Sequence, residues 1–468
     1  MKKIELFLLC WLSALLAMAG QQSDSFIIQG KITDEQNRPI ANVVVNDGIN
    51  FTTTDAYGMY TLNTDTDKCN FVRISVPAAY ELPVNEQNLF RFYLPINRKN
   101  NGGYDFKLKK RTSVDKQFTY MVFSDPQPKN DFHFVRFFTE TVPDVKAFVA
   151  QLKGDVYGFV EGDIVSDALH LYPLYTSAVA SWGISLMHVI GNHDFDLKYE
   201  ALSRVGNVSK KYAEHTYEDY YGPTDYSLNL GDIHVVCMKD IDYMGHKKYN
   251  VRFTPEQIEW LRKDLSYVKP GSTIFLNVHA PLFKVLENDA DKEVFNLLKD
   301  YNVHVFSGHT HYHKNVIMAD NIYEHNVGAV CGFHWVGDTS RCGTPNGYMC
   351  VEVDGNDVTW HFKPTGHDIN YQFKVYKPGQ FESQAEYVVA NVWDWDSTYQ
   401  INWYEDEVLK GSMEQFIDLD QDYVKSGRVN MYRTEHLFRA KPSPNTRVVK
   451  IEVTNRFGEV YTQDIKLK

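Results

Sequence analysis

The stretch ISLMHVIGNHD occupies residues 184–194 and joins an apolar run to the polar tetrad Gly191-Asn192-His193-Asp194. A short apolar run that ends in Gly and polar residues predicts a buried strand followed by a turn. Four more runs end in the same way, at 118–123, 156–160, 273–276 and 303–306. Continuous apolar runs are typical of strands covered on both faces, so we expect five buried strands of an α/β fold.

Each run leads into a polar cluster with metal-binding side chains. In chain order, the clusters are Asp125-Pro126-Gln127, Gly162-Asp163, Gly191-Asn192-His193-Asp194, His279 and Gly308-His309-Thr310-His311. A sixth polar stretch, Gly343-Thr344-Pro345-Asn346-Gly347-Tyr348, follows them. In open α/β sheets ligands bind outside the carboxyl ends of the strands. The clusters therefore predict one shared metal-binding pocket.

The side chains of these clusters suit a pair of divalent metal ions. Asp163 is the natural bridging ligand because a carboxylate has two oxygens, and Asn192 offers a carbonyl oxygen. Imidazole nitrogens suit Zn, Fe and Mn, and three histidines supply them: His279, His309 and His311. Asp125 and Gln127 are spaced like the last two histidines, with a proline between them that stiffens the turn.

The central region also contains helical patterns, so we expect βαβ units. The clearest helix begins at Thr254, an N-cap followed by Pro255 at the first helical position and by Gln257, which completes a capping box. Further helices are expected at 135–152, 168–181 and 291–300. The regions 26–108 and beyond about 351 are instead rich in short β patterns and turns.

The region 26–108 resembles the carboxypeptidase-regulatory-like, transthyretin-like module, a small β-sandwich. The resemblance rests on the strand 27–32 and on two stretches, Asn37-Arg38-Pro39-Ile40 and Thr54-Asp55-Ala56-Tyr57-Gly58-Met59-Tyr60. Asn37 stands where the module usually has Gly.

The ordered clusters resemble the calcineurin-like metallophosphoesterase superfamily, whose pattern is D-x-H, G-D, G-N-H-[D/E], a lone His and G-H-x-H. The chain is similar to a bacterial branch with added N-terminal and C-terminal β modules. The resemblance implies a β-sheet core with flanking helices. By it, the first metal is held by Asp125, Gln127, Asp163 and His311. The second is held by Asp163, Asn192, His279 and His309.

The same resemblance implies an enzyme that hydrolyses a phosphomonoester or phosphodiester with a metal-bridging hydroxide. His193 would protonate the leaving oxygen or stabilise its charge, and Asp194 would orient His193. We expect His334, Trp335 and Asn346 to contact the substrate, which would be a phosphorylated small molecule, a nucleotide or a lipid head group.

Gln127 departs from the pattern, because it stands where the superfamily usually has His. We expect two divalent ions, which are Mn, Fe or Zn. Oxygen ligands favour harder ions, so we expect Mn to be favoured at the Gln127 site. The departure also supports one alternative, a degenerate phosphoesterase fold that binds a glycan or a surface partner. The other ligand-type residues are all retained, which speaks against that alternative.

Composition limits the remaining possibilities. The chain has 468 residues and a formal net charge of -12, which argues for several domains and against a nucleic-acid-binding surface. Lys2 and Lys3, an apolar stretch at 4–18 and Ala17-Met18-Ala19 predict a signal peptide over 1–20, hence export to the periplasm or cell surface. Cys10 leaves lipidation as an alternative.

We expect no transmembrane helix in the mature chain. It would keep five cysteines, so at least one thiol is free, with room for a disulfide among Cys331, Cys342 and Cys350. The expected segments are the signal peptide at 1–20, the β-sandwich at 25–110, the catalytic domain at 115–350 and a C-terminal β-rich module at 351–468.

Overall fold

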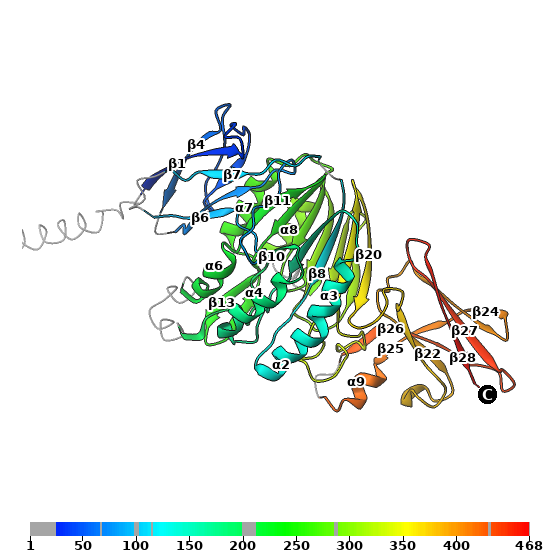
Figure 1. The fold of residues 1–468 in the computed structure, drawn as a ribbon. Coiled ribbons are helices and arrows are strands. Elements are labelled where there is room, and N and C mark those ends of the chain that lie inside the picture. The colour runs from blue at the N-terminus through cyan, green and yellow to red at the C-terminus, as the bar shows by residue number, and fades with distance from the viewer. Residues whose placement is uncertain are drawn as a thin grey trace, which may run out of the picture. The chain divides into compact units, whose positions relative to one another are not determined.

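All five apolar runs predicted as strands form strands in the computed structural model of the chain (Figure 1). The structure describes residues 25–65, 68–97, 103–113, 116–198, 212–284, 289–428 and 432–467. The chain divides into two compact units, residues 1–74 with 93–107, and residues 75–92 with 108–468. The bounds predicted for the four segments stay predictions. The expected signal peptide, residues 1–20, lies outside the described residues.

The first unit contains two small sheets. One has the strand order β4-β1-β7, with β1 (Ser25–Asp34), β4 (Met59–Asp65) and β7 (Phe106–Leu108). The other has the order β3-β2-β5-β6, with β2 (Val44–Asn46), β3 (Phe51–Thr53), β5 (Phe71–Ser75) and β6 (Tyr93–Pro95). Asn37 adopts φ 62°, a left-handed conformation that Asn tolerates better than most residues, which explains how it replaces Gly in this turn.

The central region of the second unit is built on two mixed sheets, not one. The first has the order β10-β9-β8-β19-β20, in which β8, β9 and β10 are parallel. Its strands are β8 (Gln117–Phe123), β9 (Asp155–Val160), β10 (Ser185–His188), β19 (Gly347–Asp354) and β20 (Asp357–Pro364).

The second sheet has the order β11-β12-β15-β16-β18-β17, and β12, β15, β16 and β18 are parallel. Its strands are β11 (Tyr226–Leu230), β12 (Ile233–Cys237), β15 (Thr273–Asn277), β16 (Asn302–Ser307), β17 (Lys314–Ala319) and β18 (Ile322–Asn326). A separate hairpin, β13 (Ile241–Gly245) and β14 (Lys248–Val251), stands outside both sheets.

Tyr120 of β8 ties the two sheets together face to face. Its ring centroid lies 5.1 Å from that of Phe275 on β15 and 5.6 Å from that of Phe306 on β16. Its hydroxyl donates a 2.8 Å hydrogen bond to Asn277 Oδ1. The tyrosine is fully buried, so this hydroxyl needs a partner across the interface.

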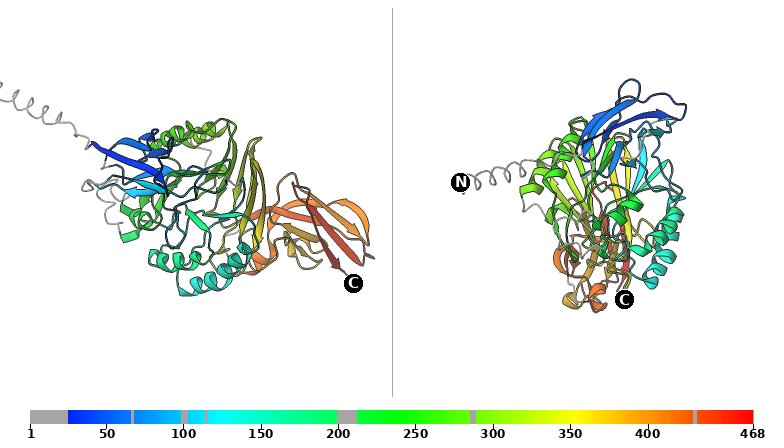
Figure 2. Two further views of the ribbon diagram at one scale, coloured as in Figure 1. Left: turned by 45° about the horizontal axis from the view of Figure 1, so that its top comes forward. Right: turned by 90° about the vertical axis from the view of Figure 1, so that its left-hand side faces the viewer.

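Helices cover the outer faces of the two sheets, so that those drawn in cyan and those drawn in light green lie on opposite sides (Figure 2). The helices are α2 (Asp131–Arg136), α3 (Val142–Val149), α4 (Tyr172–Ala180), α6 (His215–Tyr221), α7 (Pro255–Leu265) and α8 (Asp289–Leu298). The capping box predicted at α7 is confirmed, since Thr254 accepts from the Gln257 amide and the Gln257 side chain accepts in return. The helix expected at 135–152 is interrupted by a π-helical turn, Phe137–Thr141, between α2 and α3.

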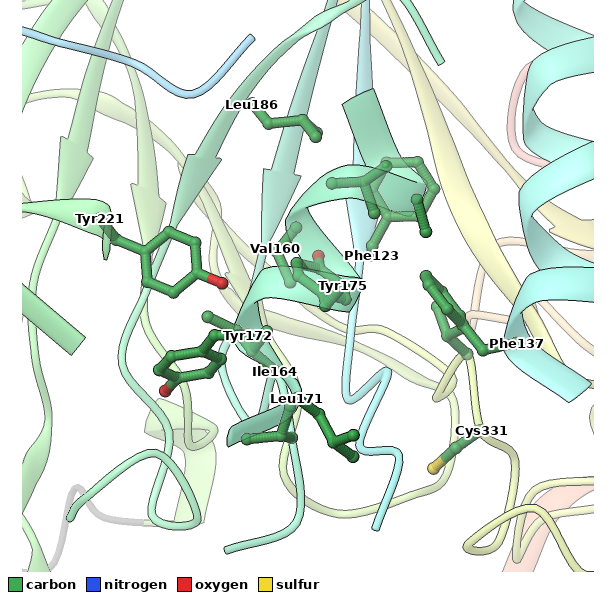
Figure 3. Close-up of a cluster of buried hydrophobic side chains, with 14 of the residues drawn as sticks. Phe123, Phe137, Val160, Ile164, Leu171, Tyr172, Tyr175, Leu186, Tyr221 and Cys331 are labelled. Atoms are coloured by element: carbon green, nitrogen blue, oxygen red, sulfur yellow. The ribbon is translucent and has the colours of Figure 1, made fainter. Parts of the chain in front are cut away.

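A cluster of aromatic and aliphatic side chains joins the first sheet to its helices (Figure 3). Phe123 and Val160 contribute from the sheet, and Phe137, Tyr172 and Tyr175 contribute from the helical side. The Phe137 and Tyr175 rings stack with centroids 5.6 Å apart. This core fixes the strands whose ends carry the polar clusters.

The C-terminal region forms two further antiparallel sheets, β21-β22-β26-β25 and β24-β23-β27-β28. Their strands are β21 (Phe373–Tyr376), β22 (Val388–Val392), β23 (Gln400–Glu405), β24 (Val408–Ser412), β25 (Glu414–Leu419), β26 (Arg433–Ala440), β27 (Val448–Thr454) and β28 (Val460–Lys466); the short helix α9 (Gln421–Lys425) lies between β25 and β26. The five described cysteines are buried free thiols, and no helix among the described residues is long and apolar enough to span a membrane.

A buried aspartate fastens the C-terminal region to the core. Asp394 Oδ1 lies 2.8 Å from His313 Nε2 and accepts a 2.7 Å hydrogen bond from Asn315 Nδ2, while Oδ2 accepts from the Phe362 amide at 3.2 Å. Asp394 is only 2 % exposed, so its charge depends on these donors.

We predict that Asp394→Ala lowers the free energy of unfolding by about 3–5 kcal/mol, because it leaves several buried donors unpaired. Chemical denaturation measures this loss. The matched control is Glu386→Ala, which removes one member of an exposed pair with Lys441 and should leave stability unchanged. Equal stability of the Asp394 variant and the wild type would show that the junction contributes nothing.

Candidate metal centre

The five predicted clusters lie at the carboxyl ends of β8, β9, β10, β15 and β16. These strands belong to two sheets, yet their ends meet, because the sheets pack face to face with these ends on one side. Asp163, His279 and His309 each offer a ligand atom, and these atoms all lie within 4.8 Å of one another. The structure thus brings Asp163 next to His279 and His309, which follow it by more than a hundred residues in the chain.

His279 is the centre of one group of candidate ligands. Its Nε2 lies 3.1 Å from Asn192 Oδ1, 3.4 Å from Asp163 Oδ1 and 3.2 Å from His309 Nδ1. Together with His279 these are the four residues predicted for the second metal. Four donor atoms that converge in this way match the number that a divalent ion takes from protein.

The residues predicted for the first metal also lie together. Asp125 Oδ1 is 3.5 Å from His311 Nε2, and it is a buried oxygen without a hydrogen-bond donor among the described residues. Gln127 Nε2 donates to Asp163 Oδ2 at 2.9 Å. In this orientation the amide nitrogen faces Asp163. For Gln127 to act as an oxygen ligand, its side-chain amide would have to flip. The ligand roles stay predictions.

Two histidines are oriented by backbone carbonyls behind them. His279 Nδ1 lies 2.7 Å from the Glu161 carbonyl oxygen, and His311 Nδ1 lies 2.8 Å from that of Gly332. Each Nδ1 donates to its carbonyl, which leaves Nε2 directed toward the cluster. Metal-binding histidines are commonly held by such a second hydrogen bond.

Burial and charge make the cluster suited to cations. Burial opposes ionisation of Asp163, but the neighbouring His279 outweighs it and holds the pKa of Asp163 well below its usual range. Burial would lower the pKa of His279, yet the Asp163 carboxylate raises it to about 10. Burial lowers the pKa of His309 to about 3 and that of His311 to about 4, so both imidazoles are neutral. Divalent ions require neutral imidazoles and ionised carboxylates; His309 and His311 meet this requirement as they stand, and His279 would lose its proton when an ion binds.

Backbone strain is concentrated at this site. Five candidate ligands have positive φ: Asp125 (46°), Gln127 (44°), Asp163 (48°), His309 (68°) and His311 (55°). Left-handed conformations in residues other than Gly are costly and cluster at functional sites. Gly162, with φ 78°, completes the turn, since an added Cβ would lie 2.6 Å from His279 Nδ1.

His193 is held by Asp167, not by Asp194. Its Nδ1 lies 3.0 Å from Asp167 Oδ1, and Asp167 also accepts a 2.9 Å hydrogen bond from Lys247 Nζ. Burial opposes protonation of His193, but the neighbouring Asp167 carboxylate raises its pKa to about 9. Nε2 remains available to the cleft.

Asp194 serves the backbone instead. Its carboxylate accepts from the amides of Gly191, Ile164 and Val165 and from the Tyr172 hydroxyl, at 2.9–3.3 Å. The prediction that Asp194 orients His193 does not hold, because Asp167 takes that position. Asp194 is fully buried and fixes the turn that carries Asn192 and His193.

The cluster opens into a cleft of ≈ 170 Å³. Its walls are Gln127, Asp163, Asn192, His193, Tyr249, His309, Thr310, His311, Phe333, His334 and Arg341. Of the three predicted substrate contacts, His334 lines the cleft, but Trp335 and Asn346 do not. Trp335 is 1 % exposed and donates to the Pro126 carbonyl oxygen at 2.8 Å, because the chain turns its large apolar side chain into the core.

Three residues at this site were missed by the sequence reasoning: Asp167, Tyr249 and Arg341. Asp167 comes only four residues after Asp163. This closeness in the sequence could have suggested a second carboxylate beside the pocket. Tyr249 lies on the β13–β14 hairpin, and its ring lies 6.1 Å from that of His309. Nothing in the sequence around Tyr249 or Arg341 marks them as pocket residues.

Family models match three consecutive parts of the chain. The model described as calcineurin-like phosphoesterase matches residues 118–313. Those described as the N terminal and the C terminal of calcineurin-like phosphoesterase match residues 26–111 and 324–461. No curated protein matches the chain.

Among solved structures, a dimetal phosphatase from Danio rerio is 14 % identical and has a TM-score of 0.37, covering 53 % of this chain and 97 % of its own. A purple acid phosphatase from yellow lupin (Lupinus luteus) is 12 % identical with a TM-score of 0.39, covering 74 % and 70 %. A 5'-nucleotidase from Candida albicans is 12 % identical with a TM-score of 0.33, covering 54 % and 52 %.

We predict that Asp163→Asn loses most of the bound divalent metal, because it removes the one carboxylate that faces both groups of candidate ligands. Elemental analysis of protein purified from Mn-supplemented cultures measures this. The matched control is Asp196→Asn, a carboxylate outside the cleft that binds Thr216 and Lys198. Full metal content in the Asp163 variant would contradict the assignment.

We also predict that Asp194→Ala costs more stability than Asp167→Asn. The first leaves three buried amides without an acceptor, at about 1–3 kcal/mol for each unsatisfied group, whereas the second keeps a hydrogen-bonding side chain at a half-buried position. Denaturant titration of both variants measures the difference. An Asp194 variant as stable as the wild type would show that the turn holds without the carboxylate.

Proposed function

Because the chain belongs to the calcineurin-like phosphoesterases, metal-dependent phosphoester hydrolases with a dinuclear divalent metal centre, we propose that it is an exported enzyme whose cleft hydrolyses a phosphomonoester or phosphodiester. The observation that carries this proposal is the convergence of Asp163, His279 and His309 at the floor of the cleft. No other group of three or more such ligand atoms occurs among the described residues.

The residues divide naturally between two ions. Asp125, Gln127, Asp163 and His311 would hold one, and Asp163, Asn192, His279 and His309 would hold the other. When bound, two divalent ions supply the charge that neutralises phosphoryl oxygens and that acidifies a water molecule. The chain contributes the fixed arrangement, since its ligands are buried, strained and anchored by backbone carbonyls.

His193 is placed to act on the leaving group. Asp167 pairs with Nδ1 and keeps the imidazole protonated, so that Nε2 also carries a proton, which can pass to the departing alcohol oxygen. Lys247 in turn pairs with Asp167 and limits the orientations of that carboxylate. Asn192 and His193 are adjacent in sequence, which places this proton donor beside the candidate ligands without making it one of them.

The proposed substrate is small and anionic. The cleft volume of ≈ 170 Å³ suits a phosphoryl group with part of its alcohol, and His334 and Phe333 form one wall. Nucleotides, sugar phosphates and lipid head groups all present such a group. Turnover of both 4-nitrophenyl phosphate and bis(4-nitrophenyl) phosphate separates monoesterase from diesterase activity.

Manganese is the proposed ion at the Gln127 site, because an amide oxygen is a harder ligand than an imidazole. Export to the periplasm or cell surface is proposed from the charged and apolar N-terminal residues. Fractionation of cells that express the full chain tests the export. Metal reconstitution with Mn, Fe or Zn, followed by activity assays, tests the ion.

The proposed function predicts turnover of a chromogenic phosphate ester by Mn-loaded wild type and a large loss in Asp163→Asn. The same metal-loaded protein with no turnover of either mono- or diester would favour the alternative of a binding protein. Titration with glycans would then be the next measurement.

We predict that His193→Ala lowers kcat for an alkyl phosphate by about 10²–10⁴-fold and has a smaller effect on 4-nitrophenyl phosphate, whose leaving group needs little protonation. Asp167→Asn should lower kcat for the alkyl phosphate by about 10- to 100-fold, again with a smaller effect on 4-nitrophenyl phosphate. Steady-state kinetics with both esters, together with metal analysis, measures this. Equal losses on the two esters at full metal content would exclude the proton-donor role.

A further inference from the structure

Two cationic side chains flank the loop that carries His311 and take no part in the proposed chemistry: Arg341 lines the cleft, and Lys284 lies against Tyr312. We call Arg341 and Lys284 the cationic rim. The chain as a whole carries a formal net charge of -12, so this local positive charge is not a general property of the surface.

Arg341 is fixed against the loop that carries two candidate ligands. Its amide donates to the His311 carbonyl oxygen at 2.8 Å, and its Nη1 donates to the Thr310 carbonyl oxygen at 3.2 Å. Arg341 also lines the cleft. It therefore lies on the His311 side, at the wall formed by the segment 333–341.

The C-terminal region holds this segment in place. Arg428 donates to the Phe333 carbonyl oxygen at 2.9 Å, and its guanidinium lies 4.8 Å from the centre of the Phe333 ring. Asn391 Nδ2 donates to the Cys342 carbonyl oxygen at 2.8 Å. The chain is thus held both before and after Arg341. A side chain that is already fixed loses less freedom when it binds an anion, which favours a binding role for Arg341.

Lys284 approaches the same loop from the segment that follows β15. It ends a short 3-10 turn, Leu282–Lys284, whose Leu282 and Phe283 amides donate to Glu324 at 2.7 and 2.8 Å. Its Nζ lies 5.0 Å from the centre of the Tyr312 ring. Tyr312 follows His311 directly, so Lys284 and Arg341 flank the same loop.

The two cations repel one another. Burial lowers the pKa of Lys284, and the charges of Arg341 and Lys314 lower it further. Like charges that lie near one another cost free energy, and an anion bound between them would recover it. A phosphate is well suited, because Arg binds it through paired N–H donors and Lys through its charge.

We infer that the cationic rim binds a second phosphate of the substrate, so that the preferred substrate is a phosphate ester whose alcohol portion carries another phosphate. The inference rests on the proposed function, in which the cleaved phosphate lies over Asp163, His279 and His309. Arg341 lines the same cleft as His193, beside which the alcohol portion of the ester would lie.

The test compares propane-1,3-diyl bisphosphate with propyl phosphate, which share the carbon chain and differ in the second phosphate. Wild type should show the higher kcat/KM for the bisphosphate. Arg341→Gln should lower the ratio of the two kcat/KM values by at least about tenfold, mainly through KM, because it removes a charge-assisted contact. Lys284→Gln should lower it by about threefold or more, and Arg341→Lys should restore part of the loss.

Arg433→Gln is the matched control, since Arg433 is an exposed arginine that binds the Ile417 carbonyl oxygen far along the chain from the rim, and it should leave the ratio unchanged. Melting temperatures of all variants report on folding. Equal kcat/KM values of wild type for the two esters, or equal losses on both esters in Arg341→Gln and Lys284→Gln, would overturn the inference. Wild type that hydrolyses neither ester nor a chromogenic ester would instead overturn the proposed function.

Discussion

The buried carboxylate of Asp163 is the constraint on which the site depends. An ionised carboxylate that is 1 % exposed is costly unless cations and donors surround it. Gln127 Nε2 and the His193 amide donate to its two oxygens, and His279 supplies nearby charge. Gln127, His193 and His279 therefore stabilise the negative charge of Asp163, against the repulsion of the nearby Asp125. The same arrangement would serve a bound divalent ion, whose charge would replace that of the histidine.

The two-sheet architecture makes that arrangement possible. Candidate ligands come from β8, β9 and β10 in one sheet and from β15 and β16 in the other. Tyr120 fixes the distance and register between the sheets by packing on Phe275 and Phe306. The turns that follow these strands hold residues with positive φ, and packing on both sides supplies the free energy that this strain costs. The centre is rigid because it stands on packed strands, not on long loops.

The C-terminal region takes part in shaping the cleft. Asp394 joins it to the core through His313 and Asn315, which follow the loop of His309 and His311. Arg428 and Asn391 hold the segment that carries Phe333 and Arg341. The walls of the cleft therefore depend on contacts made from outside the metal-binding strands.

The sequence by itself determined the strands, the helix cap at Thr254 and the metal-type residues at the strand ends. Those features depend on local patterns: apolar runs, capping residues and short polar motifs. The division of the strands between two sheets was decided only by the tertiary structure, because apolar runs do not encode which strands pair. The same holds for the pairing of His193 with Asp167, for the burial of Trp335 and for Arg341 in the cleft wall. Each depends on contacts between distant segments, and a side chain's neighbours across such contacts are set by the packing of the whole core.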